Sequence, residues 1–327
     1  MGWAGVMLLG FGAVFRFGLY CSGNEDLLMI SGSREVLNAP SPGITKIKTA
    51  QTDPFRAVGL NFNLYGDYAA VYDLEDIRSC APLSNAELIN LLKSFPGFQS
   101  CNLWAIDPVN PAQAQPLLNL LNVKYLLGPP EVTFQVGPGF RLMESSDFQI
   151  LINREAWPRA FFTDKVVSIN SNDEFIQYLS ANRDRPFVAL TKGEIAKQPE
   201  VLNLEGKNPT VVQAATSYRL RPNSTAFDIH ASSAGMVCLT EGQAKDFIAT
   251  ANNETKPVLT VNRAFKGIYL DRPGDYHIQF TYRPRYWRLA CFCFWSSVCL
   301  VIAVVVAGGI HARRRKYQAQ FLTSDHE

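Results

Sequence analysis

The chain has 327 residues, enough for one large domain or two ordinary ones. Its apolar share of 47% and charged share of 18% exclude an intrinsically disordered chain. A mean hydropathy of -0.02 excludes a chain made mostly of membrane helices. The net charge of +2 is too small to indicate nucleic-acid binding, so we expect no nucleic-acid partner.

The first 21 residues predict a membrane helix. Residues 3–15 are apolar, and after Arg16 the apolar character resumes as far as Tyr20. A cleaved secretory signal is the alternative, but it normally has a Lys or Arg before the apolar stretch and a small residue at the cleavage site. Arg16 is able to extend along the helix to the headgroups.

Residues 22–50 are rich in Gly, Ser and Pro and predict a connector with one strand over 44–49. Helix and strand patterns then alternate, which favours a small α/β unit over residues 51–132. Its expected elements are a strand at 55–60, a helix opened by the capping box Ser84–Glu87 and ended by Pro96–Gly97, a helix at 111–121 and a strand at 123–127.

Residues 133–285 are dense in short strands with turn signals about every ten residues, which is typical of a β-sandwich-like domain. Expected strands lie at 134–136, 141–144, 148–153, 160–169, 186–190, 210–220, 224–230, 235–240, 258–261, 265–270 and 276–282, with a short helix after Ser171. We therefore predict an α+β fold, with the α/β unit followed by the sandwich-like domain and transmembrane helices at both ends.

Residues 286–311 predict a C-terminal transmembrane helix. Residues 289–310 hold no charge, and at about 1.5 Å per residue they are long enough to cross the roughly 30 Å hydrocarbon layer. The basic run 311–316 follows at once, so the positive-inside rule places residues 312–327 in the cytoplasm and residues 22–285 outside. Arg283, Arg285 and Arg288 at the other end make this charge bias modest.

The sequence contains no catalytic or nucleotide-binding motif and no metal-ligand spacing, so we predict no cofactor, no metal and no catalytic residue. Asp73, Glu75 and Asp76 form an acidic cluster that is compatible with a metal site, but a solvated turn is the favoured interpretation. Trp157, Tyr65 and Tyr72 have rings that could stack on sugars, although aromatic core packing is the commoner role. Cys80 and Cys101 could form a disulfide or remain ordinary thiols.

Several stretches, in the order of the family, resemble the YfhO family of bacterial multi-span membrane proteins. They are Pro54–Arg56, Leu118–Leu127, Asn153–Phe161, Asn262–Ile268 and Pro273–Pro284. The resemblance implies a membrane glycosyltransferase whose catalytic carboxylates lie between N-terminal helices that this chain does not contain. Residues 1–21 then correspond to the end of the last core helix, and no catalytic residue can be transferred.

The resemblance leads us to expect an accessory exported domain of a membrane glycosyltransferase system that acts on envelope glycans in the bacterial cell membrane. Expected partners are the lipid bilayer, a glycan or lipid-linked sugar, and a multi-span membrane protein. Trp157 and Arg159 are the candidate substrate-binding residues. The alternative is a membrane-anchored structural or carbohydrate-binding module without a transferase role. An independent enzyme would need a carboxylate pair or a metal cluster, and the sequence shows no motif for either.

The predicted orientation can be tested at the C-terminal tail. A cysteine introduced by Ser324→Cys should escape a membrane-impermeant thiol reagent in intact cells and react after permeabilisation, because the positive-inside rule keeps the tail in the cytoplasm. The unsubstituted chain controls for the native cysteines. Labelling of the new cysteine in intact cells would reverse the orientation.

Overall fold

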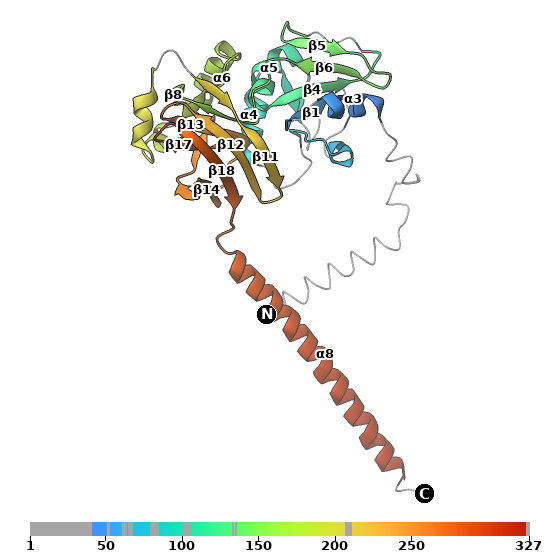
Figure 1. Cartoon of the computed structure of the whole chain (residues 1–327). Coiled ribbons are helices and arrows are strands. Elements are labelled where there is room, and N and C mark those ends of the chain that lie inside the picture. Colours follow the sequence, from blue (N-terminus) through green and yellow to red (C-terminus); the bar gives the residue numbers. More distant parts are fainter. Residues whose placement is uncertain are drawn as a thin grey trace.

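The computed structural model describes residues 41–50, 53–60, 64, 68–78, 85–100, 106–132, 134, 136–206 and 211–324. It shows a mixed α+β body from which one long C-terminal helix leaves (Figure 1). The predicted N-terminal membrane helix, Tyr65 and the cysteines Cys80 and Cys101 lie outside the described residues.

A four-stranded sheet in the order β1-β4-β6-β5 forms the first part of the body. Its strands are β1 (Arg56–Gly59), β4 (Val123–Gly128), β5 (Phe140–Met143) and β6 (Gln149–Asn153). Strands β1 and β4 pair in parallel and are linked by the helices α4 (Ala86–Ser94) and α5 (Pro111–Leu120), as expected of an α/β unit. Strands β5 and β6 pair antiparallel on its far edge, although the sequence grouping assigns them to the sandwich-like part.

The strand predicted at residues 44–49 is wrong: this segment is the helix α3 (Pro42–Ala50). The Ser41 hydroxyl accepts a hydrogen bond from the Ile44 amide at 3.1 Å, which caps the first turn, and Pro42 suits the first helical position. Ile44 and Ile47 are three residues apart, so they bury on one helix face. The segment is short, and the many Gly, Ser and Pro residues of the stretch 22–50 predicted a connector, so the helical spacing of the two isoleucines was too weak a signal to predict a helix.

The helix expected after residue 84 is confirmed as α4, and its N-cap is Asn85, whose side chain accepts from the amides of Glu87 and Leu88. The strand expected at 134–136 is absent at the described positions Phe134 and Val136. The sequence patterns missed several short elements: η2 (Tyr68–Tyr72), β2 (Phe98–Ser100), β3 (Ile106–Pro108), α7 (Lys192–Ile195), η3 (Pro199–Leu204), β14 (Phe247–Ala251) and β15 (Glu254–Lys256).

Two five-stranded sheets form the sandwich-like part. The inner sheet has the order β10-β7-β13-β17-β16, and the outer sheet has the order β11-β12-β18-β14-β15. The inner strands are β10 (Val212–Ala214), β7 (Ala160–Thr163), β13 (Gly235–Gly242), β17 (Phe265–Leu270) and β16 (Leu259–Val261); the remaining outer strands are β11 (Thr216–Arg221), β12 (Ser224–Ala231) and β18 (Gly274–Tyr282).

The central strands of the inner sheet, β7, β13 and β17, are buried on both faces, and their side chains alternate between two cores. Val237 and Leu239 of β13 pack with Phe227 and Phe280 of the outer sheet. Met236 and Cys238 of the same strand face the opposite way, into the largest core, which also contains residues of α4, α5 and the helix α6 (Asn172–Ala181). A strand buried on both faces is apolar throughout, which explains why β13 shows no alternating pattern.

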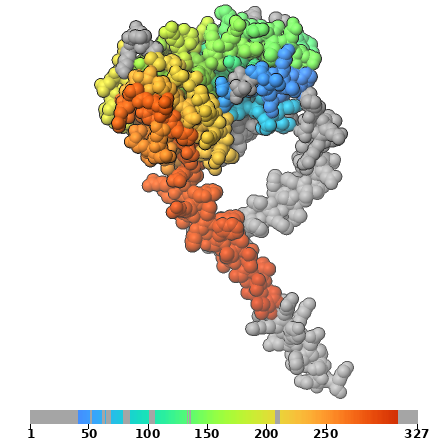
Figure 2. Space-filling view, in the orientation of Figure 1, coloured from blue at the N-terminus to red at the C-terminus, as the bar shows by residue number. Residues whose placement is uncertain are grey.

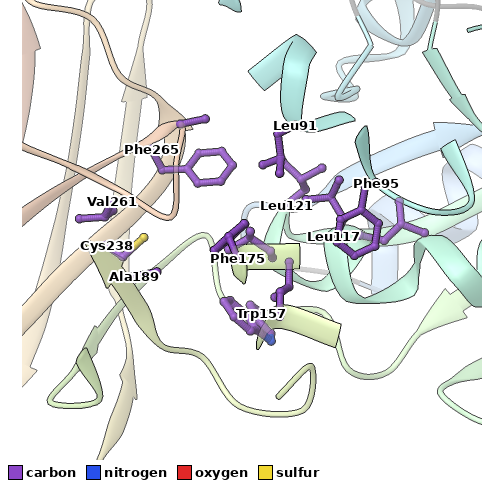
Figure 3. Packing of buried hydrophobic residues seen from close by; sticks show 14 of the residues in the cluster. Leu91, Phe95, Leu117, Leu121, Trp157, Phe175, Ala189, Cys238, Val261 and Phe265 are labelled. Carbon is purple, nitrogen blue, oxygen red and sulfur yellow. The ribbon is translucent and has the colours of Figure 1, made fainter. Parts of the chain in front are cut away.

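The largest core joins the two parts of the body. Figure 3 shows Leu91, Phe95 and Leu117 from the α/β unit beside Phe175 and Phe265 from the sandwich-like part. The short parallel pair β8 (Val166–Ser168) and β9 (Val188–Leu190) completes this core next to α6. Because the apolar surface is shared, we expect the two parts to unfold as one unit.

Helix α8 (Trp287–Ser324) continues from β18 after a four-residue link, 283–286. Its apolar span Trp287–Ile310 contains an 18-residue window whose mean hydropathy is 2.6 and of which 0% is buried inside the body, so by length and composition this helix could cross a membrane. Figure 2 shows it leaving the body without packing against it.

We predict that the body folds without α8, because the apolar part of this helix contributes no buried surface to it. A chain limited to residues 22–285 should be monodisperse and should give a circular dichroism spectrum rich in β-structure. Persistent aggregation, or a largely helical spectrum, would contradict the independent fold. The full chain in detergent provides the reference.

Candidate functional site

Five charged side chains meet where the α/β unit and the sandwich-like part touch, and we call them the charge cluster. Its members are Arg56, Glu75, Arg159, Glu241 and Lys266. Arg56 begins β1, and Glu75 forms an isolated bridge with it. Arg159 directly precedes β7, Glu241 lies at the irregular end of β13, and Lys266 belongs to β17. Three cations face two carboxylates, and the side chains of all three cations are buried.

Arg56 links the two parts of the body through backbone carbonyls. Its Nη1 donates to the Leu121 carbonyl oxygen at 2.7 Å, at the end of α5, and its Nη2 donates to the Thr240 carbonyl oxygen at 2.8 Å, on β13. Burial and the nearby Arg159 lower the pKa of Arg56 from 12.5 to about 9, so it stays a cation at neutral pH. A buried guanidinium satisfied in this way fixes the distance between the two elements.

Arg159 bridges the two carboxylates of the charge cluster. Its Nη1 lies 2.7 Å from Glu75 Oε2, and its Nη2 donates to Glu241 Oε1 at 3.0 Å. Its Nε is buried and has no hydrogen-bond partner among the described residues. Both ion pairs of Glu75 with described residues use its Oε2, so its Oε1 forms no ion pair with a described residue. The Glu75 side chain is 42% exposed.

Glu241 is the electrostatic centre of the charge cluster. Lys266 Nζ donates to its Oε2 at 3.1 Å, and the Thr225 hydroxyl lies 3.1 Å from both carboxylate oxygens. Burial alone would raise the pKa of Glu241, but the charges of Arg159 and Lys266 outweigh it and lower this pKa from 4.5 to about 2. Glu241 is therefore a permanent anion at neutral pH.

A cleft of about 240 Å³ opens beside this cluster. Its wall consists of Glu75, Arg159 and Glu241, the β11–β12 turn and Phe247; the full lining is Glu75, Arg159, Leu220, Arg221, Pro222, Asn223, Ser224, Thr225, Glu241 and Phe247. The Tyr282 amide donates to the Asn223 carbonyl oxygen at 2.8 Å, so the turn lies against the end of β18 that leads to α8. Figure 1 shows the ends of β11 and β18 on the side from which α8 leaves.

The cleft presents polar groups of both kinds. Glu75 supplies a carboxylate on a side chain that is 42% exposed, and its Oε1 forms no ion pair with a residue that the structure describes. The exposed side chains of Arg221 and Asn223 supply donors in the lining. The Phe247 ring supplies an apolar wall, and Lys266 Nζ lies 3.6 Å from the centroid of this ring. Such a mixture of donors, acceptors and one ring suits an uncharged polyhydroxylated ligand.

Of the two candidate binding residues from the sequence, Arg159 lines the cleft and Trp157 does not. Trp157 is 1% exposed, its rings contact Phe161 and Phe187 edge-on, and its indole Nε1 donates to the Arg183 carbonyl oxygen at 2.9 Å. No face of this ring is open to a sugar, so core packing describes its role. Tyr72 packs against a smaller core with α3.

The acidic cluster Asp73, Glu75 and Asp76 divides among three different partners. Asp73 is exposed near Lys48, Glu75 joins the charge cluster, and Asp76 is buried against Arg78 with Oδ2 2.7 Å from Nη2. The interpretation as a solvated turn fits Asp73 and fails for Asp76. Among the described residues, no group of three or more His, Cys, Asp and Glu side chains is placed to hold a metal ion.

A second cleft of about 350 Å³ lies on the outer sheet, at the other end of β12 and β18. It contains two cross-strand pairs, His230–Asp275 and His277–Asp228, each with 2.7 Å between Nδ1 and Oδ1. All four side chains are at least 43% exposed, so water screens these pairs. We therefore place the candidate site at the first cleft, where the buried guanidinium of Arg159 pairs with two carboxylates.

Comparisons with known proteins give no match to a family model, a curated protein or a solved structure.

The charge cluster makes a prediction about stability. Because the folded-state pKa of Glu241 is below its ordinary value, its contribution is present above pH 4.5 and is lost as the pH falls toward about 2. Glu241→Gln should lower the free energy of unfolding at neutral pH by about 3 kcal/mol.

Urea unfolding of residues 22–285 measures this difference, which should shrink steadily below pH 4.5. Glu254→Gln is the matched control, because Glu254 is 71% exposed and its ion pair with Lys256 lies at the surface. A loss of similar size in both variants, or one independent of pH, would contradict the assigned role of Glu241.

Proposed function

We propose that this chain is a membrane-anchored, extracytoplasmic module that binds a saccharide in the cleft beside the charge cluster and serves as the accessory exported domain of an envelope glycosyltransferase system. The observation that carries the proposal is the cleft itself. It is lined by the partly exposed carboxylate of Glu75 and the exposed guanidinium of Arg221, and it lies at the end of the body next to α8.

The size and the lining of the cleft support a sugar as the ligand. At about 240 Å³ it is smaller than the roughly 300–1,000 Å³ of pockets for drug-sized molecules, so it suits one sugar unit. Sugar hydroxyls both donate and accept hydrogen bonds, which matches the Glu75 carboxylate and the Arg221 guanidinium. The charges of the lining residues Glu75, Glu241, Arg159 and Arg221 balance, which favours an uncharged ring over an ion.

The ionisation of the cleft carboxylates favours binding over turnover. A general acid must be protonated near the working pH, yet the pKa of Glu241 is about 2. Glu75 and Glu241 both pair with Arg159, so both carboxylates take part in the structural charge cluster. We therefore assign catalysis to a multi-span partner and ligand contact to this chain.

The link to a transferase system rests on the resemblance in sequence and on the position of the cleft near α8. A lipid-linked sugar lies at the bilayer surface, so a cleft at the α8 end of the body is near it. The alternative module without a transferase role uses the same cleft. Stable co-purification of the chain with a multi-span membrane protein from its native membrane separates the two functions.

Saccharide binding can be measured by calorimetry on the full chain in lipid nanodiscs. Glucose, galactose and N-acetylglucosamine are the probes, and we expect at least one to bind. Glu75→Gln should weaken that binding about tenfold or more, because a hydrogen bond to a charged acceptor contributes about 1.5–3 kcal/mol. Glu87→Gln, an exposed position on α4, is the matched control and should bind normally.

Two outcomes would contradict the proposal. Absence of binding by all three sugars and their disaccharides at millimolar concentration would remove the cleft as a saccharide site. Transfer from a lipid-phosphosugar that Glu75→Gln abolishes would make the chain an enzyme in its own right.

A further inference from the structure

Three segments meet at the end of the body from which α8 leaves, and we call them the membrane-proximal rim. They are the β11–β12 turn at 221–223, the segment 244–248 and the segment 282–288. The Tyr282 amide donates to the Asn223 carbonyl oxygen at 2.8 Å, and the Arg283 amide donates to the Asp246 carbonyl oxygen at 2.9 Å. The rings of Phe247 and Tyr282 are 5.2 Å apart, so the three segments form one surface.

The rim carries an excess of positive charge that the rest of the body does not neutralise. Its cations are Arg221, Lys245, Arg283, Arg285 and Arg288, and all five are exposed. None of them forms a salt bridge with a residue that the structure describes. Asp246 is the single acid in these segments, and its carboxylate lies near the Arg285 amide.

Exposed apolar and aromatic side chains accompany these cations. Leu220 and Ile248 flank the rim from the two outer strands, and Tyr286 and Trp287 stand at the start of α8. The Arg285 guanidinium lies 5.9 Å from the centroid of the Tyr286 ring. Aromatic rings beside arginines at the beginning of an apolar helix are typical of the membrane interface.

We propose that the membrane-proximal rim rests on anionic lipid headgroups of the leaflet that α8 enters. The inference rests on the membrane anchoring in the proposed function. The link 283–286 between β18 and α8 is only four residues long and spans at most about 14 Å, which keeps the rim at headgroup depth when Trp287–Ile310 crosses the bilayer. Unpaired Lys and Arg side chains within a Debye length of anionic lipids are attracted to them.

This contact places the cleft at the lipid surface. Arg221 and Asn223 belong both to the rim and to the cleft lining. A ligand that is itself attached to a lipid would then reach the cleft with its sugar at headgroup height. The rim thus determines which end of the body meets the bilayer, whereas α8 alone would leave the body free to tilt.

Hydrogen–deuterium exchange of the full chain in nanodiscs tests the contact. One set of discs contains phosphatidylcholine alone, and the other contains phosphatidylcholine with phosphatidylglycerol. We expect amides of 219–223 and 244–248 to exchange several-fold more slowly in the anionic discs. The difference should vanish at about 1 M salt, where the Debye length is about 3 Å.

Charge variants distinguish the rim from the general charge of the body. The combined variant Arg221→Gln, Lys245→Gln, Arg283→Gln and Arg285→Gln should lose the lipid-dependent protection, and replacement of its three arginines by Lys should retain it. Lys93→Gln with Lys192→Gln is the matched control, because both lysines are exposed and lie outside the rim. All substituted positions are at the surface, so the variants should unfold like the parent.

The outcomes separate this inference from the proposed function. Equal exchange in both discs, with the chain integrated, would overturn the lipid contact and leave the anchoring and the cleft intact. Protection that persists in phosphatidylcholine discs only when a co-purified acidic protein is present would assign the rim to that protein instead. Failure of the chain to integrate into discs would overturn both.

Discussion

The buried guanidinium of Arg56 and the pairing of Arg159 with two carboxylates determine how the two parts of this body fit together. Arg56 donates to the carbonyl oxygens of Leu121 and Thr240, one on each side of the junction. Removing one partner from such a buried cluster leaves uncompensated charge, which typically costs about 3–5 kcal/mol. The charge cluster therefore fixes the junction beside the shared apolar core and forms one wall of the cleft.

The segments that carry the family resemblance have structural roles in the described residues. Asn122, with a left-handed φ of 58°, donates to the Trp157 carbonyl oxygen at 2.7 Å. Asn262, with a φ of 47°, accepts from the Ala189 amide at 2.6 Å and donates to the Phe187 carbonyl oxygen at 3.0 Å. Asparagine tolerates this conformation, and its amide satisfies buried backbone groups that a loop would otherwise leave unpaired. In the described residues, these asparagines of the motifs therefore have a structural role: they hold loops of the body together.

The sequence predicts elements where local signals are strong and fails where long-range pairing decides. The capped helix at Ser171 and the turn at 221–223 are both confirmed, because capping and turn chemistry are local. The membership of β5 and β6 in the first sheet depends on pairing with β4, which no periodicity contains. The charge cluster was equally hidden, since Arg56 and Glu241 are 185 positions apart and each resembles an ordinary surface charge. Only Arg159 of the cluster was named from the sequence as a binding residue.

The charges at the two ends of α8 have different consequences. By the positive-inside rule, arginines on the outer side weaken the orientation that residues 311–316 favour. Such residues need a compensating role, and the membrane-proximal rim gives one, because Arg283 and Arg285 stand beside Arg221 and Lys245 from segments far apart in the sequence. The cations of the rim come together only when the chain folds, because they lie in distant segments. The basic residues 311–316 are already neighbours in the sequence. In the arrangement that we propose, the first kind of charge orients the body on the lipid, and the second kind orients the helix across it.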